Sequence, residues 1–174
     1  MADGTGLITH LFMHEKDLSI LLEVLVISAL AGLLGWERES SGKAAGLRTH
    51  ILVGIASTLF IVIGESMAVS FRTLGDHIRF DAANLIGAIV TGISFLGAGM
   101  IIFKKADSDV QGLTTAAGIL TTAAIGMLVG LERFFLAVGT TVIVFIVLRF
   151  VTTFEIKIDA SRQPDEAEKP DTAD

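Results

Sequence analysis

The chain has 174 residues, 52% of them hydrophobic, and a mean hydropathy of +0.70. A soluble domain of this length has too small a core to bury so many apolar side chains, so the composition excludes an ordinary soluble domain and indicates a membrane protein. The absence of cysteine excludes disulfides and thiolate metal sites. The net charge of −6 says little about partners, because residues 155–174 form a tail with seven acidic and three basic residues and so contribute −4 of it.

Five apolar segments follow one another, separated by short charged links. A helix of about 20 residues crosses the hydrocarbon core of a bilayer, which is about 30 Å thick. Residues 1–17 lack the features of a cleaved signal peptide and are expected to form an extracytoplasmic segment, and residues 153–174 a short acidic cytoplasmic tail, mostly disordered. We therefore predict an all-α integral membrane protein, a bundle of five transmembrane helices, with spans at about 18–36, 51–71, 82–103, 110–130 and 134–152.

The distribution of lysine and arginine predicts the orientation of these spans. With five spans, the side that holds the N-terminus carries four such residues, and the other side carries nine, or six when the tail beyond Arg149 is left out. Cytoplasmic loops of membrane proteins carry an excess of Lys and Arg. We therefore expect the N-terminus outside and the C-terminus in the cytoplasm.

The spans differ in side-chain size, which predicts their places in the bundle. The third and fourth are rich in Gly, Ala, Ser and Thr, and the fourth ends in a GxxxG motif from Gly126 to Gly130. Small residues let helix backbones approach closely, which is the main packing device in lipid. We expect the third and fourth spans in the interior and the bulky fifth span at the lipid edge. Helix packing explains the small-residue faces, and a ligand path is the alternative.

Four ordered motifs lie along the apolar part of the chain. They read Gly-x-Glu-Arg-Glu from Gly35, Ala-Gly-Leu-Arg-Thr-His from Ala45, Gly-x-x-Phe-Leu-Gly-Ala-Gly from Gly92 and Gly-Leu-Thr-Thr-Ala-Ala from Gly112. In this order they resemble the MgtC/SapB family of bacterial membrane proteins, over residues 18–151. The resemblance implies a multi-pass protein of the bacterial inner (plasma) membrane with five spans.

The resemblance also carries functional expectations. Family members are linked to growth at low magnesium, to acid stress and to the virulence of pathogens inside host cells. The best studied members look like regulators that restrain the F-type ATP synthase, and they are not established magnesium transporters. Carried over to this sequence, the family's characteristic positions are Glu37, Arg38, Gly46, Leu47, Arg48, Thr49, Asp76, Arg79, Gly92, Phe95, Leu96, Gly97, Gly99, Gly112, Thr114, Thr115, Ala116 and Ala117.

The sequence departs from the family pattern at several points. Ser94 stands where many members have Gly, and Thr121 stands where the virulence-type members have Cys. Those members continue into a cytoplasmic regulatory domain, whereas residues 153–174 are too short to form one. The chain therefore resembles the short subtype that lacks this domain.

Charged residues flank the link between the first two spans. Glu37 and Arg38 lie where the first helix leaves the membrane and Arg48 lies where the second enters it, so Glu37 or Glu39 could pair with Arg48 across the hairpin. Such a pair would act as a structural clamp, because interfacial charges mostly anchor or solvate a helix end. The alternative is a docking surface for a partner or an anionic headgroup.

Two acidic residues fall inside the spans near their outer ends. Glu23 lies five residues into the first span and Glu65 six residues from the outer end of the second, so their carboxyl groups reach similar depth; Asn84 enters the third span from the same side. Ionisable residues in spans are costly and are candidates for function. The pair could share a proton or hold a cation, or both side chains could extend outward to the headgroups.

No phosphate loop, nucleophile elbow or dinucleotide fingerprint is present, so the sequence predicts neither an enzyme nor a cofactor or metal site. The expected partners are the lipid bilayer, a membrane complex such as the F-type ATP synthase, and a second copy of the chain, with no role for nucleic acid. Two function classes remain. The first is a regulator of another membrane complex, and the second is a small cation or proton transporter or channel that uses Glu23 and Glu65.

Overall fold

The computed structural model describes residues 4–74, 81–102 and 112–162, with side chains described for residues 16–71, 81–101 and 112–150. This part of the chain consists of five helices and contains no strand, which confirms the predicted all-α fold class. The helices are α1 (Gly4–Ser40), α2 (Leu47–Leu74), α3 (Ala82–Ile102), α4 (Leu113–Gly130) and α5 (Phe134–Arg162).

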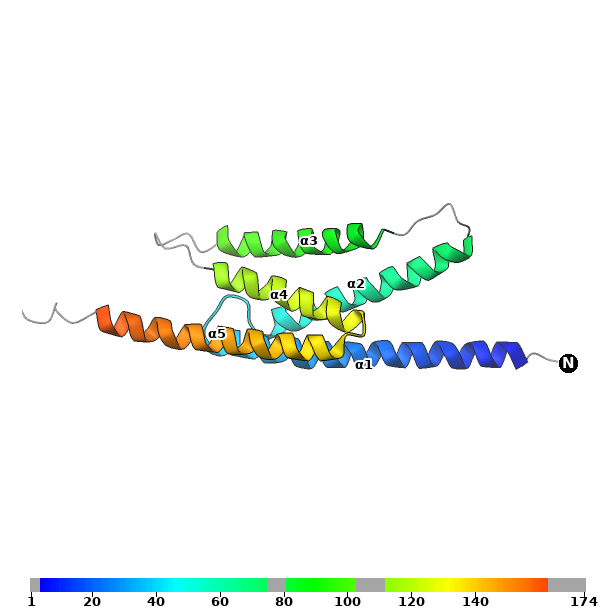
Figure 1. Cartoon of the computed structure of the whole chain (residues 1–174), viewed down its shortest axis with the longest axis horizontal. Coiled ribbons are helices and arrows are strands. Elements are labelled where there is room, and N and C mark those ends of the chain that lie inside the picture. The colour runs from blue at the N-terminus through cyan, green and yellow to red at the C-terminus, as the bar shows by residue number, and fades with distance from the viewer. Residues whose placement is uncertain (1–3, 75–80, 103–111, 163–174) are drawn as a thin grey trace, which may run out of the picture.

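Successive helices run back and forth along the long axis of the molecule, so α1, α3 and α5 point one way and α2 and α4 the other (Figure 1). Four of them contain apolar stretches of 18 to 25 residues, long enough to cross a membrane, and α5 contributes a shorter one; the stretches are Lys16–Ser40, Leu47–Phe71, Ala82–Ile101, Leu113–Gly130 and Phe134–Phe150. The described helices therefore form a multi-pass membrane bundle.

Three of the five helices, α1, α2 and α5, are longer than the apolar segments that predicted them. α1 starts at Gly4, inside the expected N-terminal segment, and α5 continues to Arg162, into the tail that was expected to be mostly disordered. Hydropathy marks the part of a helix that lies in lipid, whereas the helix itself ends where its backbone changes direction. The turn after α1 contains Gly42, whose φ of 65° lies in the left-handed region that glycine adopts without a steric penalty.

The core lies where α1, α2 and α4 meet. Ile27, Ala31 and Leu34 of α1 and Ile125 and Val129 of α4 are at most 1% exposed. Half of the apolar stretch of α4 is buried, the largest share among the four long stretches. The prediction that the fourth span lies in the interior is therefore confirmed.

Glycines set the close crossing of α2 and α4. A Cβ atom on Gly126 would lie 2.5 Å from the carbonyl oxygen of Gly54, and one on Gly130 would lie 2.8 Å from that of Thr58. The Thr58 hydroxyl also donates a hydrogen bond to the Gly126 carbonyl, at 2.8 Å. The GxxxG motif thus packs α4 directly on the backbone of α2, as small residues do in lipid.

The third span is not in the interior, contrary to the prediction. α3 lies along one edge of the bundle (Figure 1), and only 17% of its apolar stretch is buried. Its small residues Gly87, Thr91, Ser94 and Ala98 are exposed, and a Cβ atom on Gly87 would meet nothing within 4 Å. Only one face of α3, with Ile89, Ile93 and Gly97, is buried. Small residues permit close packing but do not require it, which is why their density misplaced this helix.

The fifth helix lies at the edge of the bundle, as its bulky side chains predicted. Phe135 is 90% exposed, and Ile143 and Phe150 are also exposed. Ala137, Thr141 and Leu148 form the buried face of α5. A membrane helix with one packed face and one large apolar exposed face is suited to contact with lipid.

Candidate functional site

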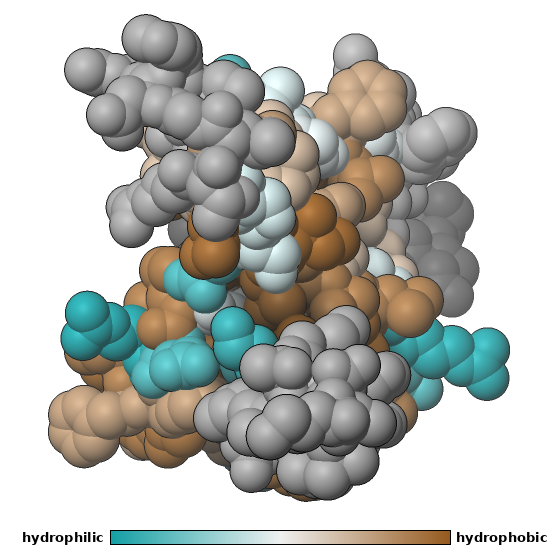
Figure 2. Space-filling model, turned by 90° about the vertical axis from the view of Figure 1, so that its right-hand side faces the viewer, coloured by the Kyte–Doolittle hydropathy of each residue, from teal (hydrophilic) through white to brown (hydrophobic). Residues whose placement is uncertain are grey.

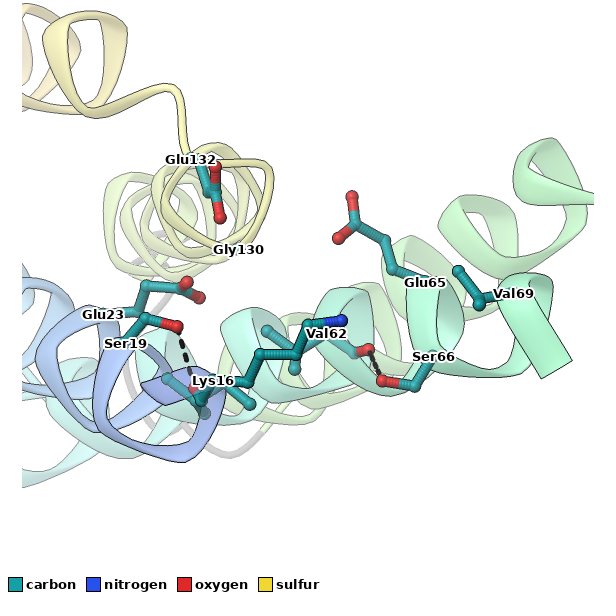
Figure 3. Close-up of a pocket in the computed structure, with 10 residues that line it drawn as sticks. Lys16, Ser19, Glu23, Val62, Glu65, Ser66, Val69, Gly130 and Glu132 are labelled. Carbon is teal, nitrogen blue, oxygen red and sulfur yellow. Dashed lines mark hydrogen bonds between the residues drawn. The ribbon is translucent and has the colours of Figure 1, made fainter. Parts of the chain in front are cut away.

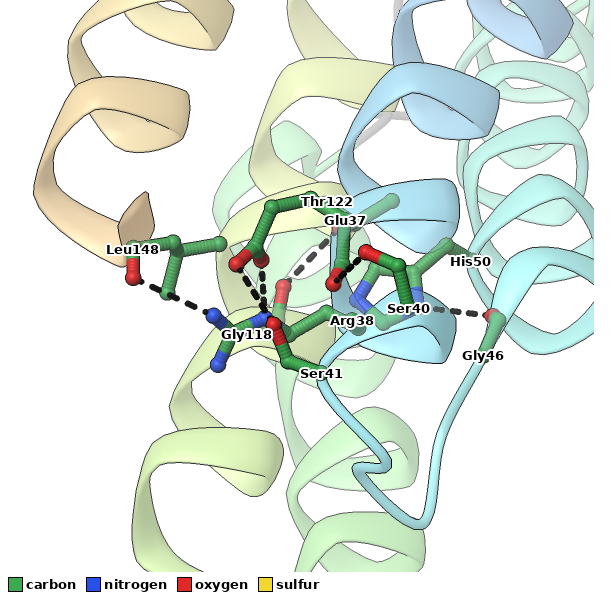
Figure 4. A network of polar contacts seen from close by, with 9 residues as sticks. All are labelled: Glu37, Arg38, Ser40, Ser41, Gly46, His50, Gly118, Thr122 and Leu148. Atoms are coloured by element: carbon green, nitrogen blue, oxygen red, sulfur yellow. Dashed lines mark hydrogen bonds and ion pairs between the residues drawn. The ribbon is translucent and has the colours of Figure 1, made fainter. Parts of the chain in front are cut away.

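Two charged side chains are buried at the end of α1. Glu37 is 2% exposed and Arg38 is 1% exposed, and the two form an ion pair through Arg38 Nε and a Glu37 carboxylate oxygen (Figure 4). A cation in the last turn of a helix also interacts favourably with the helix dipole. The pair is therefore a buried, charge-neutral unit at the start of the α1–α2 turn.

Neighbouring groups complete the hydrogen bonds of this pair. Ser41 donates to Glu37 Oε1 at 3.1 Å, and Arg38 Nη2 donates to the Leu148 carbonyl of α5 at 3.3 Å (Figure 4). The Ser40 hydroxyl donates to the Glu37 backbone carbonyl at 2.9 Å. A buried ion pair is tolerated when its remaining polar atoms are satisfied. The pair therefore ties α1 and its turn to α5.

The start of α2 is held by Glu39 and by two glycines. Glu39 Oε2 accepts a hydrogen bond from the Leu47 N–H at 2.8 Å, which satisfies one of the free donors at a helix start. A Cβ atom on Gly46 would lie 2.7 Å from the same carboxylate oxygen, and one on Gly35 would lie 2.7 Å from Leu47 Cα. The expected pairing of a glutamate with Arg48 is not among the ion pairs of the described residues, and Arg48 is exposed.

His50 completes the polar cluster at this end of the bundle. Its side chain is fully buried, and Nδ1 lies 3.0 Å from the Gly46 carbonyl. Nε2 has no hydrogen-bond partner, and a Cβ atom on Gly118 of α4 would lie 3.7 Å from it. The sequence places His50 in the second motif, but its burial against α4 was not predicted. We call Glu37, Arg38, Ser41, Gly46 and His50 the hairpin cluster.

A cavity of about 370 Å³ opens near the other end of the bundle, between α1, α2 and the end of α4 (Figure 3). Figure 2 shows this end of the molecule, where hydrophilic side chains interrupt an otherwise apolar surface. The polar residues that line the cavity are Lys16, Ser19, Glu23, Glu65, Ser66 and Glu132. We call this the acidic cavity.

Three carboxyl groups point into the acidic cavity from different helices and turns (Figure 3). Glu23 of α1 is 5% exposed, and its Oε2 has no hydrogen-bond partner. Glu65 of α2 and Glu132 are exposed, and Glu132 lies in the α4–α5 turn with a φ of 58°. The sequence predicted that Glu23 and Glu65 reach similar depth, and both line this cavity. It did not indicate Glu132, because that residue belongs to a link far away in sequence.

Asn84 was expected near these acids, but it is not among the residues that line the acidic cavity. It is exposed in the first turn of α3, where its backbone N–H and that of Ala83 donate to Asp81 Oδ1 at 3.1 and 3.0 Å. Asp81 is therefore the N-cap of α3. Within the described residues no three His, Asp or Glu side chains stand close enough to ligate one metal ion directly.

Comparison with known proteins decides the family. The model of the MgtC family matches residues 25–156, most of the chain. The chain belongs to the MgtC family. It is 40% identical over 125 residues to "Putative magnesium transporter YhiD" of Escherichia coli K12, which covers 71% of this chain and 57% of that protein. It is 37% identical over 134 residues to "Protein MgtC" of Salmonella typhimurium LT2, which covers 76% of this chain and 53% of that protein.

A third relative is an uncharacterized protein of Haemophilus influenzae, 33% identical over 149 residues, or 86% of this chain and 62% of that protein. This MgtC-family chain therefore spans little more than half the length of the curated relatives it matches. No solved structure matches it.

Most of the remaining residues that carried the MgtC resemblance fall on α3, on α4 and directly before α4. Gly97 is buried, and a Cβ atom on it would lie 3.2 Å from Ala116 Cβ, whereas Gly92 and Gly99 face open space and Phe95 is 79% exposed. Gly97 is thus the contact point of α3 with α4. Gly92, Gly99 and Phe95 lie on a largely uncovered face of α3.

Gly112 precedes α4 with a φ of 104°, a conformation that favours glycine. Thr115 is buried, Thr114 and Thr49 are exposed, and the Thr121 hydroxyl donates to the Ala117 carbonyl at 2.8 Å within the helix. The side chains of this motif therefore serve helix packing or remain exposed. The motif positions Asp76 and Arg79 lie outside the described residues.

Proposed function

We propose that this MgtC-family protein regulates another complex in the bacterial inner membrane during magnesium limitation or acid stress, rather than conducting ions itself. The observation that carries the proposal is the separation of the hairpin cluster from the acidic cavity. In the described helices no charged side chain lies between the two, and the space on α1 is filled by Ile27, Ala31 and Leu34.

The separation is large enough to matter for an ion. Glu23 and Glu37 lie on the same helix about 21 Å apart along its axis, at 1.5 Å per residue. Moving an ion across a layer of that length, with no charged side chain on the way, is costly. A static bundle of this kind is better suited to binding than to conduction.

The uncovered face of α3 supports a partner within the bilayer. Gly92 and Gly99 leave space for another helix to approach, and Phe95 protrudes beside them. An apolar groove of about 620 Å³ lies next to this face, between α2 and α3, and Gly92 lines it. Membrane helices associate through such small-residue faces. The candidate partner is the F-type ATP synthase, because the best studied family members look like regulators that restrain it. A second copy of the chain is the alternative partner.

The test is capture of the partner by a variant whose own fold is unaffected. Gly92→Leu adds a side chain where a Cβ atom meets nothing within 4 Å, so the bundle should remain intact while a partner helix is blocked. Gly139→Leu on α5 is the matched control, because Gly139 is equally open. In inverted membrane vesicles, we expect the wild type and the Gly139→Leu variant to slow ATP hydrolysis and to co-purify with ATP synthase subunits.

The Gly92→Leu variant should lose both effects at equal protein level. Equal capture by all three proteins would overturn the assignment of α3 as the docking face. Absence of capture and inhibition by the wild type would overturn the choice of ATP synthase. Self-association that is lost only in Gly92→Leu would make the partner a second copy of the chain.

The acidic cavity favours a second candidate function, a cation or proton transporter that uses Glu23 and Glu65. The name of the E. coli relative, "Putative magnesium transporter YhiD", points in the same direction. The unpartnered hydroxyl of Ser57, buried between the two polar ends, is the group such a path would use. Proton and magnesium flux into proteoliposomes should be absent for the wild type, whereas flux that a Glu23→Gln, Glu65→Gln double variant abolishes would select the transporter.

A further inference from the structure

We propose that the acidic cavity is a binding site for a hydrated divalent cation of the magnesium class, with Glu23 as its buried carboxylate and Glu65 and Glu132 as its exposed ones. The inference goes beyond the proposed function, because it assigns a ligand site and is tested without any partner. It rests on burial, charge and volume in the described part of the chain.

Glu23 is the group that points to a ligand. Its side chain is 95% buried and lines the cavity, yet Oε2 makes no hydrogen bond. A buried carboxylate oxygen without a partner costs free energy, so a native structure that retains one usually has a use for it. The carboxyl groups of Glu65 and Glu132 face the same space (Figure 3), and no Lys or Arg among the described residues forms an ion pair with any of the three.

The charge of the cavity matches a divalent cation. Its lining holds three carboxyl groups and one ammonium group, that of Lys16, which gives a net charge of −2 when all are ionised. Lys16 is exposed and bonds to none of the three acids, so the negative charge is not neutralised from within. A divalent cation would neutralise this charge of −2 completely, whereas a monovalent cation would neutralise only half of it.

The size of the cavity accommodates a cation that keeps its water. Among the side chains that the structure describes, no three acidic ones stand close enough to ligate one bare ion. Magnesium gives up its water reluctantly and is typically bound through one or two carboxylates while it keeps several waters. Six waters at about 30 Å³ each occupy about 180 Å³, which fits within the cavity of about 370 Å³. The cation would then sit among the carboxylates and bind most of them through water.

The place of the site determines from which side the cation enters. Glu132 belongs to the short turn that joins α4 to α5, and that turn lies at a helix end rather than within the bundle. The cavity therefore opens at the level of the membrane surface, on the side that the distribution of Lys and Arg predicts to be outside. The site is placed to bind magnesium from outside the cell, with no need for the ion to cross the bundle.

The experiment measures cation binding to the purified full chain in lipid nanodiscs. Bound Mn²⁺, observed by electron paramagnetic resonance and displaced by Mg²⁺, reports the affinity. We expect Glu23→Gln and Glu132→Gln each to weaken binding about tenfold, because each removes one of the charges that attract the ion. Lys16→Gln should tighten binding about threefold, because it removes a competing cation. Glu39→Gln, the same change at the far end of α1, should bind as the wild type does.

Lys16→Gln also guards against a loss of folding as the explanation, because a damaged fold does not bind more tightly. Glu132→Gln serves the same purpose, because the change is isosteric and the side chain lies in an exposed turn. Equal affinity in the wild type, Glu23→Gln and Glu132→Gln would overturn the proposal. So would weaker binding by Lys16→Gln, or the absence of saturable wild-type binding at ~10 mM, above the weak extracellular range of ~1 mM. Failure of the regulator proposal would leave this result unaffected, because no partner is present.

Discussion

The hairpin cluster and the acidic cavity are both polar sites at the ends of an apolar bundle, but they treat buried charge in opposite ways. Glu37 and Arg38 are at most 2% exposed and are paired with each other, with Ser41 and with the Leu148 carbonyl. Glu23 is 5% exposed and has a carboxylate oxygen with no hydrogen-bond partner in the part of the chain that the structure describes. A charge that is fully satisfied by its own chain belongs to the architecture, whereas one left unsatisfied is available to a ligand.

The contrast also separates the family motif from the candidate ligand site. The motif residues Glu37, Arg38 and Gly46 all serve the α1–α2 hairpin, while none of the three cavity acids belongs to a motif that carried the resemblance. The first two motifs therefore stabilise the fold at this end of the bundle. Ligand chemistry, where it exists, lies at the other end.

The largest effect is expected from breaking the hairpin pair on one side only. Arg38→Met leaves the Glu37 carboxylate buried without its cation, which costs about 3–5 kcal/mol of folding free energy. The double variant Glu37→Gln, Arg38→Met removes both charges and should recover most of that loss. Unfolding of the purified protein in detergent measures both, and a double variant as unstable as the single one would contradict the reading of the pair as a charge-neutral unit.

A second test compares two glycines from the two small-residue spans, one packed and one open. Gly126→Leu places a side chain against the Gly54 carbonyl at the α2–α4 crossing and should cost about 1–3 kcal/mol through overpacking. A Cβ atom on Gly92 would meet nothing within 4 Å, so Gly92→Leu should leave stability nearly unchanged. Thermal unfolding of the two variants measures the stability that each loses. Equal losses of stability would mean that α3 is covered as closely as α4.

The different positions of α3 and α4 show what the sequence could and could not predict. The apolar runs were enough to predict five helices, and the GxxxG motif was enough to place α4 in the interior. The small residues of α3 gave the same signal, yet that helix lies at the edge. A small side chain removes an obstacle to packing without supplying a contact, so sequence cannot say whether a partner helix is present.

The polar contacts were harder to predict for a geometric reason. Sequence pairing rules for helices apply to residues three or four apart, so an ion pair between the adjacent Glu37 and Arg38 was not expected, and Arg48 was favoured instead. Glu132 joins Glu23 and Glu65 only because the end of α4 brings the α4–α5 turn to the same cavity. The depth of Glu23 and Glu65 follows from counting residues along two helices, but a third partner from a distant turn does not.

A smaller effect is expected at the start of α2. Glu39→Ala removes the acceptor of the Leu47 N–H and should cost about 1 kcal/mol, the usual contribution of such a cap. Glu39→Gln keeps an acceptor oxygen and should cost less. The midpoint of thermal unfolding distinguishes them, and an alanine variant as stable as the wild type would show that the hairpin is held by the buried ion pair and the glycines alone.

The smallest effect on stability should come from Glu23→Gln. The sign of this change in stability is what best distinguishes the acidic cavity from the hairpin cluster. Glu23→Gln keeps the size of the side chain and removes a charge that no partner stabilises, so in the absence of divalent cations the variant should be as stable as the wild type or more stable, by less than about 1 kcal/mol. Added magnesium should then stabilise the wild type by about 0.4 kcal/mol at a concentration equal to its Kd and leave the variant unchanged.

Thermal unfolding with and without magnesium measures both parts of this prediction. Glu37→Gln is the matched comparison, because there the same isosteric change removes the partner of Arg38 and should destabilise the protein whether or not magnesium is present. If Glu23→Gln destabilised the protein as Glu37→Gln does, the Glu23 carboxylate would have a partner within the fold. The two ends of the bundle would then use buried charge in the same way, and the acidic cavity would be part of the architecture.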